Sequence, residues 1–483
     1  MKPTIMKFGG TSVEGATAFK NAAGIVFDRQ ALRPVVVVSA MAGFTDALIG
    51  SVQHASTVGG DAGAAKIMRE LEKHFDRHLR VIDALLLSEA ARMRQLVHQS
   101  RVEIRELLEA AAAEAKRAEV DEFRKRPKFF ADAVVSYGER MSAALLAAVL
   151  AENKVVSRNV DARRCVITDG DHGCAIPLMA ETFCNTRKEL GPLIESSCVP
   201  VLGGFIGSTV TGETTTLGRG GSDYTAALIG AALEAREIQI WTDVPGVLTA
   251  DPRLVANART VPHLSFEEAA ELAYFGARVL HPKTLHPAIE RDIPVRICNS
   301  RAQEGGSTLV VGESKKSPQT VKAIAHKTGV TTVQVTSTRM LGAYGFLRAL
   351  FEVFEEHKTA VDVVTTSEVS VSLSLDDTTS LNEIVAKLER LGAVTIEGKR
   401  AILCVVGEGL RTTPGIAARI FSTISDINVS LISQGASRIN LTFAVGEERV
   451  RETVTRLHKE FFEGSESEDA LRERNELRAE VSA

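Results

Sequence analysis

The sequence lacks several patterns that mark other classes of protein. None of its six cysteines forms a CxxC pair, which argues against a structural zinc site or a disulfide framework and favours buried free thiols. Its 57 lysines and arginines nearly balance its 61 aspartates and glutamates, so charge gives no reason to expect nucleic acid as a partner. The longest apolar run, residues 143–151, is about half a membrane span, and the N-terminal residues reach glycine and polar residues too early for the pattern of a signal peptide. We therefore expect a cytoplasmic protein that contacts no membrane.

Aromatic residues make up only 5% of the chain, so its cores must consist mainly of Val, Leu, Ile and Ala. At about 150 residues per domain, the 483 residues predict two to four domains. The phosphate-binding pattern GxxxxGK[ST] does not occur.

A different glycine-rich segment lies near the N-terminus. The apolar residues 5–6 are followed by Lys7-Phe8-Gly9-Gly10. Glycines after a strand let the backbone approach a ligand, and their N–H groups can surround phosphate oxygens. The neighbouring lysine supplies a positive charge for the same phosphates. Taken alone, the segment is equally compatible with a strand-end turn that carries a surface lysine.

Four consecutive valines at 35–38 predict a buried parallel strand, because such strands are apolar almost throughout. Ser39 and Thr45 follow among small residues, at the carboxyl end where open α/β sheets carry their binding sites. The segment therefore predicts part of a ligand site.

A helical pattern from Ala62 to Glu122 places His74 and His78 four residues apart, a spacing that a metal pair can use. The residues between them lack the glutamate of zinc proteases, and the stretch is rich in charge. We expect both histidines on a solvated helix face, and we assign no metal-ligating residues in the chain.

Glu139 follows the apolar residues 133–135 and precedes a strongly apolar helical stretch at 141–150. This order predicts a strand-to-helix junction with Glu139 near the helix N-terminus. A carboxylate there is stabilised by the helix dipole, so it could act simply as a cap. The functional alternative is a carboxylate that receives the ammonium group of a substrate.

The block from Pro200 to Tyr224 is the most specific part of the chain. A predicted strand leads into a glycine turn, and three glycines, Arg219 and Asp223 then precede a helix predicted at 226–235. The N-terminus of a helix is a ready site for anions. Arg219 can bind a carboxylate through two hydrogen bonds, and Asp223 can hold an ammonium group.

A further strand, predicted at 238–242, ends in Thr242-Asp243 and a Pro-Gly turn, an arrangement compatible with nucleotide binding. Arg253 and Arg278 add two cations further along the chain.

From Val330 onwards, short predicted strands and helices alternate in a βαββαβ order that occurs twice. Residues 360–364 match residues 428–432 at an offset of 68 positions. The repeat resembles a pair of ACT modules, small ferredoxin-like folds that sense amino acids. Because so few helices can cover only part of the sheets, we expect the modules to pair in a homodimer or homotetramer. We expect residues 464–483 to form a charged, disordered tail.

The motifs KFGGTS, VSAMAGFT, SYGE, GGFIG, TTTLGRGGSDYTA, WTDVPG, DPR and FGARVLHP occur in this order. Together they resemble the aspartate kinases of the amino acid kinase family, from about Ile5 to Phe462. The resemblance implies an α/β fold, with an αβα-sandwich kinase domain at 1–312 and two ferredoxin-like ACT modules at 319–398 and 399–463. It also implies phosphoryl transfer from ATP, with Mg²⁺, to the β-carboxylate of L-aspartate. We expect a monofunctional, lysine-sensitive enzyme without a homoserine dehydrogenase domain.

The resemblance also assigns roles to residues, motif by motif. It implies that the catalytic residues are Lys7 and Asp223, and that the residues that bind aspartate are Ser39, Thr45, Glu139, Arg219 and Asp223. It implies that the nucleotide site includes Lys7, Phe8, Gly9, Gly10, Thr242, Asp243, Leu248, Arg253 and Arg278. It implies that a site for L-lysine as effector includes Met340, Ala343, Phe346, Leu347, Ala360, Val361, Asp362, Ser367 and Glu368.

Some positions depart from the lysine-sensitive bacterial pattern. Leu248 stands where a tyrosine is expected and Arg278 where a lysine is expected, which puts nucleotide affinity in doubt. Gly342 and Ala343 replace polar residues, and MLGxYGFL resembles plant enzymes, in which a second effector can contribute. Threonine and S-adenosylmethionine therefore stay open beside L-lysine. Asp362 could hold the ammonium group of the effector, or it could simply cap a turn.

Two rival functions stay open. One is an amino acid kinase for another acidic substrate, which GRGGSDYTA and the paired ACT modules argue against. The other is a non-catalytic amino acid sensor, which the presence of Lys7, Arg219 and Asp223 argues against. The β-carboxylate of aspartate is already ionised at neutral pH, so no general base is required. This is consistent with the absence of a Ser-His-Asp or Cys-His arrangement.

Overall fold

The computed structural model describes residues 2–58, 61–117, 126–276, 282–303, 305–313, 320–342 and 344–463. The chain forms two compact units. The first consists of Met1–Val247, Pro262–Phe266 and Leu280–Glu313, and the second of Leu248–Val261, Glu267–Val279 and Ser314–Ala483. The second unit thus includes two segments that the resemblance assigned to the kinase domain. The expected tail, 464–483, lies outside the described residues.

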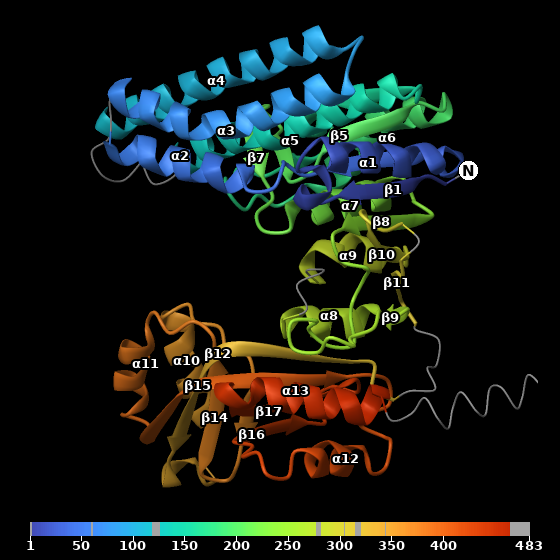
Figure 1. The fold of residues 1–483 in the computed structure, drawn as a ribbon. Helices are drawn as coiled ribbons and strands as arrows, with labels where there is room; N and C mark the ends of the chain where they lie inside the picture. The colour runs from blue at the N-terminus through green and yellow to red at the C-terminus, as the bar shows by residue number, and fades with distance from the viewer. Residues whose placement is uncertain are drawn as a thin grey trace, which may run out of the picture. The chain divides into compact units, whose positions relative to one another are not determined.

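An eight-stranded sheet forms the centre of the first unit (Figure 1). In sheet order its strands are β3 (Ser157–Val160), β5 (Val199–Gly203), β2 (Pro34–Val38), β1 (Thr4–Phe8), β8 (Glu237–Thr242), β10 (Val295–Asn299), β11 (Thr308–Val311) and β9 (His263–Ser265). Neighbouring strands are parallel except for β10 and β11. The valines at 35–38 are completely buried, because helices cover both faces of a parallel sheet. The strand predicted there is confirmed.

Helices form a layer on each face of this sheet. They are α1 (Ala16–Asp28), α2 (Phe44–Val58), α3 (Asp61–Leu85), α4 (Ala90–Arg117), α5 (Arg126–Glu152), α6 (Met179–Glu195), α7 (Gly221–Ala232) and α9 (Pro282–Glu290). Helices α1 to α4 pack with α5 in one layer, and α6 and α9 pack with α7 in the other. A small sheet consists of β4 (Ile167–Thr168), β6 (Ile206–Thr209) and β7 (Thr214–Thr216). The arrangement is the expected αβα sandwich.

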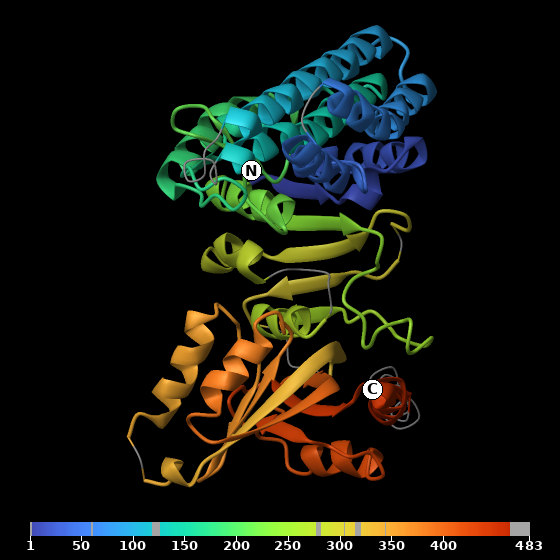
Figure 2. The same ribbon diagram turned by 90° about the vertical axis from the view of Figure 1, so that its left-hand side faces the viewer.

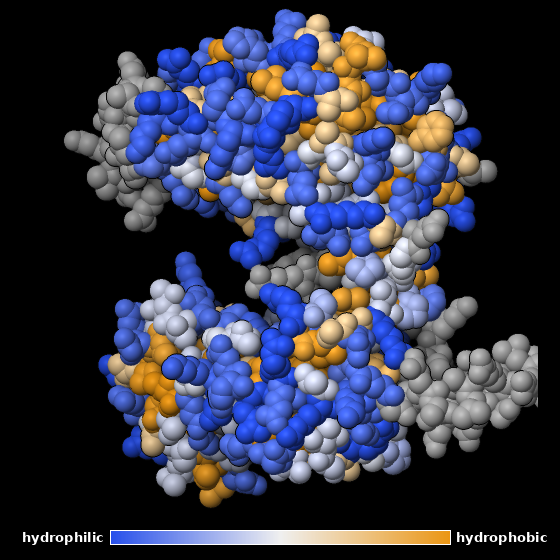
Figure 3. All heavy atoms as spheres, in the orientation of Figure 1, coloured by the Kyte–Doolittle hydropathy of each residue, from blue (hydrophilic) through white to orange (hydrophobic). Residues whose placement is uncertain are grey.

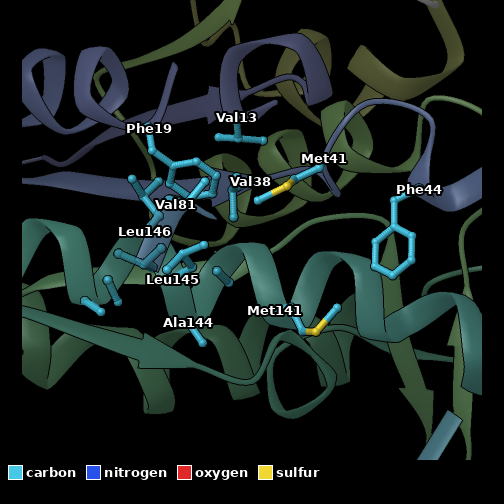
Figure 4. Close-up of a cluster of buried hydrophobic side chains, with 14 of the residues drawn as sticks. Val13, Phe19, Val38, Met41, Phe44, Val81, Met141, Ala144, Leu145 and Leu146 are labelled. Carbon is cyan, nitrogen blue, oxygen red and sulfur yellow. The ribbon is translucent and has the colours of Figure 1, made fainter. Parts of the chain in front are cut away.

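The main core of the first unit lies between α5 and β2. Figure 4 shows Leu145 and Leu146 of α5 close to Val38 of β2 and Phe19 of α1. One helical stretch, Lys128–Glu152, is long and apolar enough to cross a membrane, but 89% of its most apolar window is buried inside the protein. Its apolar character is therefore explained by its central place in this core.

Glu139 lies within α5, so the predicted strand-to-helix junction is wrong. Residues 133–135 and 141–150 belong to one continuous helix. A helix that is buried on nearly all sides has no polar face, and a short apolar segment of it cannot be distinguished from a buried strand by its pattern. Glu139 is therefore held by helical backbone on both sides.

His74 and His78 are buried, so the prediction of a solvated helix face is wrong. Both rings pack against the ring of Phe44 in α2. Burial lowers the pKa of His78 to about 4, and its Nδ1 lies 2.8 Å from the carbonyl oxygen of His74. Leu71 and Phe75 are buried on the same helix. The high charge of α3 thus conceals one stripe that faces the core.

All six cysteines are unpaired, but they are not all buried as expected. Cys165, Cys298 and Cys404 are buried, and burial raises the pKa of each thiol to about 12. Cys174 and Cys184 are exposed. The spacing of the cysteines argued against disulfide pairing, but it gave no information about which thiols are exposed.

A six-stranded antiparallel sheet forms the centre of the second unit. In sheet order its strands are β13 (Val364–Thr366), β14 (Ser370–Leu375), β12 (Ala323–Thr336), β15 (Ala393–Val406), β17 (Asn440–Gly446) and β16 (Leu431–Gln434). Its helices are α10 (Phe346–Glu356), α11 (Leu381–Leu388), α12 (Ile416–Thr423) and α13 (Val450–His458), and α8 (Phe266–Tyr274) belongs to it from the second residue onwards. Figure 2 shows α10 and α11 on one side of the strands, and α12 and α13 on the other.

Strands β12 and β15 are 14 residues long, and each contributes to both modules. Residues 330–336 of β12 pair with the first half of β15, and residues 323–327 pair with its second half. The start of β12 therefore completes the module that contains β16, β17, α12 and α13. The expected boundary at 398 falls inside β15, which is one continuous strand instead of two. A pattern of alternating apolar residues does not distinguish a bent strand from two short ones.

Candidate active site and effector site

A cavity of about 750 Å³ lies in the first unit, near the carboxyl ends of β1 and β2 and the N-terminus of α7. Its lining includes seven of the predicted catalytic and binding residues, which are Lys7, Gly10, Ser39, Thr45, Glu139, Arg219 and Asp223. Parallel strands bring their carboxyl ends to one edge of the sheet, so residues far apart in the sequence meet there.

Lys7 and Asp223 form an ion pair at this cavity. Lys7 lies in β1 and Asp223 in the first turn of α7, and Nζ lies 2.6 Å from Oδ1. The side chains are 12% and 14% exposed, so the pair is largely shielded from solvent and still reachable from the cavity. An ammonium group has three N–H donors, so Lys7 can bind a ligand oxygen while it stays paired. Asp223 thus holds a cation beside the N-terminus of α7, where anions are favoured.

The turn before α7 exposes Arg219 to the cavity. Gly218 and Gly220 flank it with φ angles of 74° and 73°, a left-handed conformation that strains other residues. Arg219 is exposed and forms no ion pair within the described part of the chain. Its guanidinium is therefore available for two hydrogen bonds to a carboxylate.

Glu139 supplies a buried carboxylate that is only partly satisfied. It is 3% exposed, and its Oε1 accepts a hydrogen bond from the backbone N–H of Ala40 at 3.2 Å. Its Oε2 has no hydrogen-bond partner among the described residues. Burial raises the pKa of Glu139 to about 8. Because an unsatisfied buried oxygen is costly, this position favours a ligand that brings a donor, such as an ammonium group.

Asp132 also lines the cavity and is absent from the residues predicted from the sequence. Its carboxylate accepts hydrogen bonds from the hydroxyl of Thr216 and the backbone N–H of Gly173, and it lies 3.0 Å from Nδ1 of His172. Burial raises the pKa of Asp132 in spite of these bonds. Asp132 thus joins β7 and a nearby turn to α5. Its spacing of seven residues from Glu139 places both on one face of a helix, a signal that requires knowing that the segment is helical.

The predicted nucleotide residues of β1 and β8 lie at neighbouring strand ends. The N–H of Gly9 donates to the carbonyl of Trp241 at 3.0 Å, which places Gly9 next to Thr242, and Asp243 follows as an exposed residue. The side chain of Phe8 is fully buried and stacks on Trp241, so only its backbone can face a ligand.

Two other predicted nucleotide residues, Leu248 and Arg253, are not among the residues that line this cavity. Leu248 and Arg253 belong to the second unit, where the exposed Arg253 pairs with Asp251 at 2.6 Å. Arg278 lies outside the described residues.

In the second unit, Asp362 is already bonded to groups of the chain itself. Nζ of Lys327 lies 2.9 Å from Oδ2, and the hydroxyl of Tyr274 donates to Oδ1. The side chain of Asp362 is 3% exposed. Lys327 also pairs with Asp376 at 2.7 Å. The carboxylate predicted to hold an effector's ammonium group thus already holds the ammonium group of a lysine.

The other predicted effector residues come from two segments of the same module. The first segment carries Met340, Phe346 and Leu347, and the second carries Ala360, Val361, Ser367 and Glu368. The N–H of Ser337 donates to the carbonyl of Val369 at 2.7 Å, which brings the segments side by side. Ala343 lies outside the described residues.

Comparison with known proteins decides the family. The sequence profile of the amino acid kinase family matches residues 2–299, and that of an ACT domain matches residues 403–461. Aspartokinase 3, chloroplastic, of Arabidopsis thaliana is 38% identical over 472 residues, which cover 95% of this chain and 81% of that protein. Lysine-sensitive aspartokinase 3 of Escherichia coli is 36% identical over 469 residues, which cover 95% and 99%. The chain belongs to the aspartokinases of the amino acid kinase family.

Solved aspartokinase structures have the same fold. E. coli aspartokinase III in complex with aspartate and ADP, in the R-state, matches with a TM-score of 0.79 at 35% identity, over 95% of this chain and 100% of that one. The complex with lysine and aspartate, in the T-state, matches with a TM-score of 0.77 at 35% identity, over 96% and 100%. The aspartokinase fold and family inferred from the motifs are therefore confirmed.

Proposed function

We propose that the chain transfers the γ-phosphoryl group of ATP to the β-carboxylate of L-aspartate, giving 4-phospho-L-aspartate and ADP. The observation that carries this proposal is the cavity in which Arg219, Lys7 and the unsatisfied Oε2 of Glu139 meet. Arg219 can bind a carboxylate, Glu139 can bind an ammonium group and Lys7 can bind a phosphate. The names of the relatives and the aspartate–ADP complex of the E. coli enzyme support the same reaction.

The reaction needs alignment and charge neutralisation. The β-carboxylate is ionised at neutral pH, so it attacks without a general base. Glu139 and Arg219 would fix the substrate by its ammonium group and a carboxylate, which orients the second carboxylate. Lys7, held by Asp223, would stabilise negative charge on the phosphoryl group as it moves.

We infer that Mg²⁺ accompanies ATP. Among the described residues, no group of three His, Cys, Asp or Glu side chains could hold a metal ion. Mg²⁺ often binds through one or two carboxylates and the phosphates of a substrate, and Asp223 is the cavity carboxylate beside Lys7. When bound, Mg²⁺ neutralises charge on the β- and γ-phosphates. Titration of an ATP analogue with and without Mg²⁺, in the parent and in Asp223→Asn, tests this role.

The activity is tested by ADP release and by trapping the acyl phosphate as a hydroxamate with hydroxylamine. Aspartate should give both signals, and glutamate, the control substrate, should give neither. ADP release without hydroxamate would indicate hydrolysis of ATP instead of transfer. No aspartate-dependent signal of either kind would favour the non-catalytic sensor.

We also propose that L-lysine inhibits the enzyme by binding at Asp362. The name of the lysine-sensitive E. coli relative and the complex of aspartokinase III with lysine support this effector. Asp362→Ala should strongly weaken the response to lysine, measured against its own uninhibited rate. Lysine, threonine and S-adenosylmethionine should be titrated separately and together. Absence of lysine inhibition in the parent enzyme, alone or with a co-effector, would contradict the lysine assignment.

We propose that a second copy of the chain covers the first residues of α10 and the segment before it, in a homodimer or homotetramer. Leu341, Tyr344, Leu347 and Phe351 are each at least 38% exposed. Figure 3 shows apolar side chains gathered on the surface near α10 and α11. Such a patch is rare on a monomer. Light scattering should give a dimer or tetramer mass for the parent and a lower mass for Leu347→Glu combined with Phe351→Glu.

We place the enzyme in the cytoplasm. The six unpaired cysteines support a reducing compartment. Cell fractionation with detection of aspartate-dependent activity tests this location.

A further inference from the structure

We propose that Lys327 is a built-in competitor of the effector, because its ammonium group occupies Asp362 and must leave before a free L-lysine can bind there. This inference rests on the proposed effector role of Asp362. It adds the residue that sets the affinity of the site.

The geometry around Asp362 gives Lys327 two carboxylates. Its Nζ lies 2.9 Å from Oδ2 of Asp362 and 2.7 Å from Oδ2 of Asp376. It also lies 5.1 Å from the centre of the Tyr274 ring, within range of a cation–π contact. Burial alone would lower the pKa of Lys327, but the two carboxylates raise it above its ordinary value. Lys327 is therefore charged at neutral pH.

The competitor and the proposed effector have the same chemistry. The side chain of Lys327 ends in the primary ammonium group, on a four-carbon stem, that the side chain of free L-lysine also carries. Carboxylate oxygens that accept hydrogen bonds from one of these ammonium groups can therefore accept them from the other. The side chain of Asp362 is 3% exposed and that of Asp376 is 43% exposed. A ligand must therefore displace Lys327 from the buried carboxylate of Asp362.

Asp376 makes the exchange possible. When a free ammonium group takes Asp362, Lys327 can keep its ion pair with Asp376. The buried carboxylate of Asp362 and the displaced ammonium group of Lys327 then both stay paired. A buried charge without a partner would be far more costly than the exchange. The affinity for the effector should therefore depend on how strongly Asp376 competes with Asp362 for Lys327.

The exchange is also linked to α8. Tyr274, the last residue of α8, donates to Asp362. Two residues later, Gly276 lies so close to β12 that a Cβ atom there would lie 2.3 Å from the carbonyl oxygen of His326. His326 directly precedes Lys327 in β12. Residues 274–276 are therefore held at one end by the bond of Tyr274 to Asp362 and at the other by the close packing of Gly276 on β12. A change of partner at Asp362 acts on this short segment, which contains the start of the FGARVLHP motif.

Two substitutions should change lysine affinity in opposite directions. Lys327→Met keeps most of the stem and removes the charge, so calorimetry should give a dissociation constant for L-lysine that is roughly tenfold lower. The inhibition curve should move to lower lysine by a similar factor. Asp376→Asn leaves Lys327 with Asp362 alone, so lysine should bind about fivefold more weakly than to the parent.

Lys387→Met is the matched control. Lys387 pairs with Glu356 on the surface of the same module, so the variant removes a lysine–carboxylate pair that does not include Asp362. Its lysine affinity should equal that of the parent.

The outcomes separate this inference from the proposed effector. A parent that binds no L-lysine overturns the effector assignment and this inference with it. A parent that binds lysine, with Lys327→Met equal or weaker, overturns the inference alone and leaves Asp362 as the effector site. Thermal unfolding should be recorded for each variant. If Lys327→Met does not fold, the change in lysine affinity of Asp376→Asn tests the inference. Weaker binding than in the parent would support the competition, and unchanged or tighter binding would contradict it.

Discussion

Each unit contains a lysine–aspartate ion pair at a proposed ligand site, and the two pairs differ in what surrounds them. Lys7 and Asp223 face a cavity in which Oε2 of Glu139 has no partner among the described residues. Lys327 and Asp362 lie in a cluster in which each carboxylate oxygen of Asp362 already has a partner from the chain. The first site is therefore open to a ligand, and the second is occupied by its own side chains.

This difference has a thermodynamic consequence. In the open site, a buried carboxylate carries an unfavourable desolvation that substrate binding can relieve, so the site is prepared for a ligand. In the occupied site, a ligand gains an ion pair only by breaking one that exists, and the net free energy of binding is smaller. An enzyme that must bind its substrate well and respond only to excess effector can use both arrangements.

The largest expected effect belongs to the open site. Lys7→Ala removes the cation that would stabilise the moving phosphoryl group, so kcat should fall by roughly 10²–10³-fold, as for other single electrostatic contacts to a transition state. Steady-state ADP release at saturating aspartate and ATP measures the change.

Lys20→Ala is the control for this variant, because Lys20 is an exposed lysine of α1. It should leave kcat unchanged. Retention of kcat by Lys7→Ala, with only a raised KM for ATP, would show that Lys7 binds the ground state and does not act on the transfer.

Arg219→Ala should act on aspartate and leave the nucleotide in place. Loss of one partner of a desolvated charge pair costs about 2 kcal/mol or more, so kcat/KM for aspartate should fall at least roughly 30-fold. Equilibrium binding of an ATP analogue should be unchanged within error. Unchanged aspartate kinetics would remove Arg219 from the substrate site.

The contrast between the two sites also separates what the sequence could and could not predict. The valine strand at 35–38 was predictable because a buried parallel strand is apolar throughout. The glycines around Arg219 were informative because positive φ angles and a helix N-terminus leave few other choices of residue. Motif order then predicted the family, since so many specific segments rarely occur together by chance.

The failures have a common physical cause, which is tertiary packing. The helix that contains Glu139 is buried all round, so it has no polar stripe that would distinguish it from a strand. The burial of His78 depends on which face of α3 meets Phe44. The bond between Tyr274 and Asp362 joins residues that no local pattern relates. A sequence motif identifies a carboxylate, but only the fold shows whether that carboxylate is free.

A pH effect of moderate size follows from the free carboxylate. Glu139 must be ionised to pair with an ammonium group, and its pKa is raised to about 8 by burial. Aspartate should therefore bind roughly tenfold more tightly at about pH 8 than at about pH 6.5. Calorimetry in buffers of different ionisation enthalpy should detect proton release on binding near pH 7.

Glu139→Gln is the control for this pH effect, and its proton release should be lost. The raised pKa of Glu139 also makes the free energy of unfolding depend on pH. Between the unfolded value near 4.5 and about 8, the folded state binds more protons, so its stability falls as pH rises. The parent should therefore lose free energy of unfolding relative to Glu139→Gln across that range. A pH-independent difference would contradict the shifted pKa.

The smallest expected effect concerns the occupied site. Tyr274→Phe removes one hydroxyl donor from Asp362 and keeps the ring beside Lys327. The net contribution of one hydrogen bond is about 1 kcal/mol, so lysine affinity should change by less than roughly tenfold. It should rise, because the carboxylate loses one competing donor. The fraction of activity lost at saturating lysine should nevertheless decrease, because the exchange at Asp362 is no longer linked to α8 through this bond. Calorimetry and the plateau of the inhibition curve, measured on the same preparation, give the two quantities separately. Tighter lysine binding with undiminished maximal inhibition would mean that the hydroxyl of Tyr274 competes for Asp362 but does not couple lysine binding to the loss of activity.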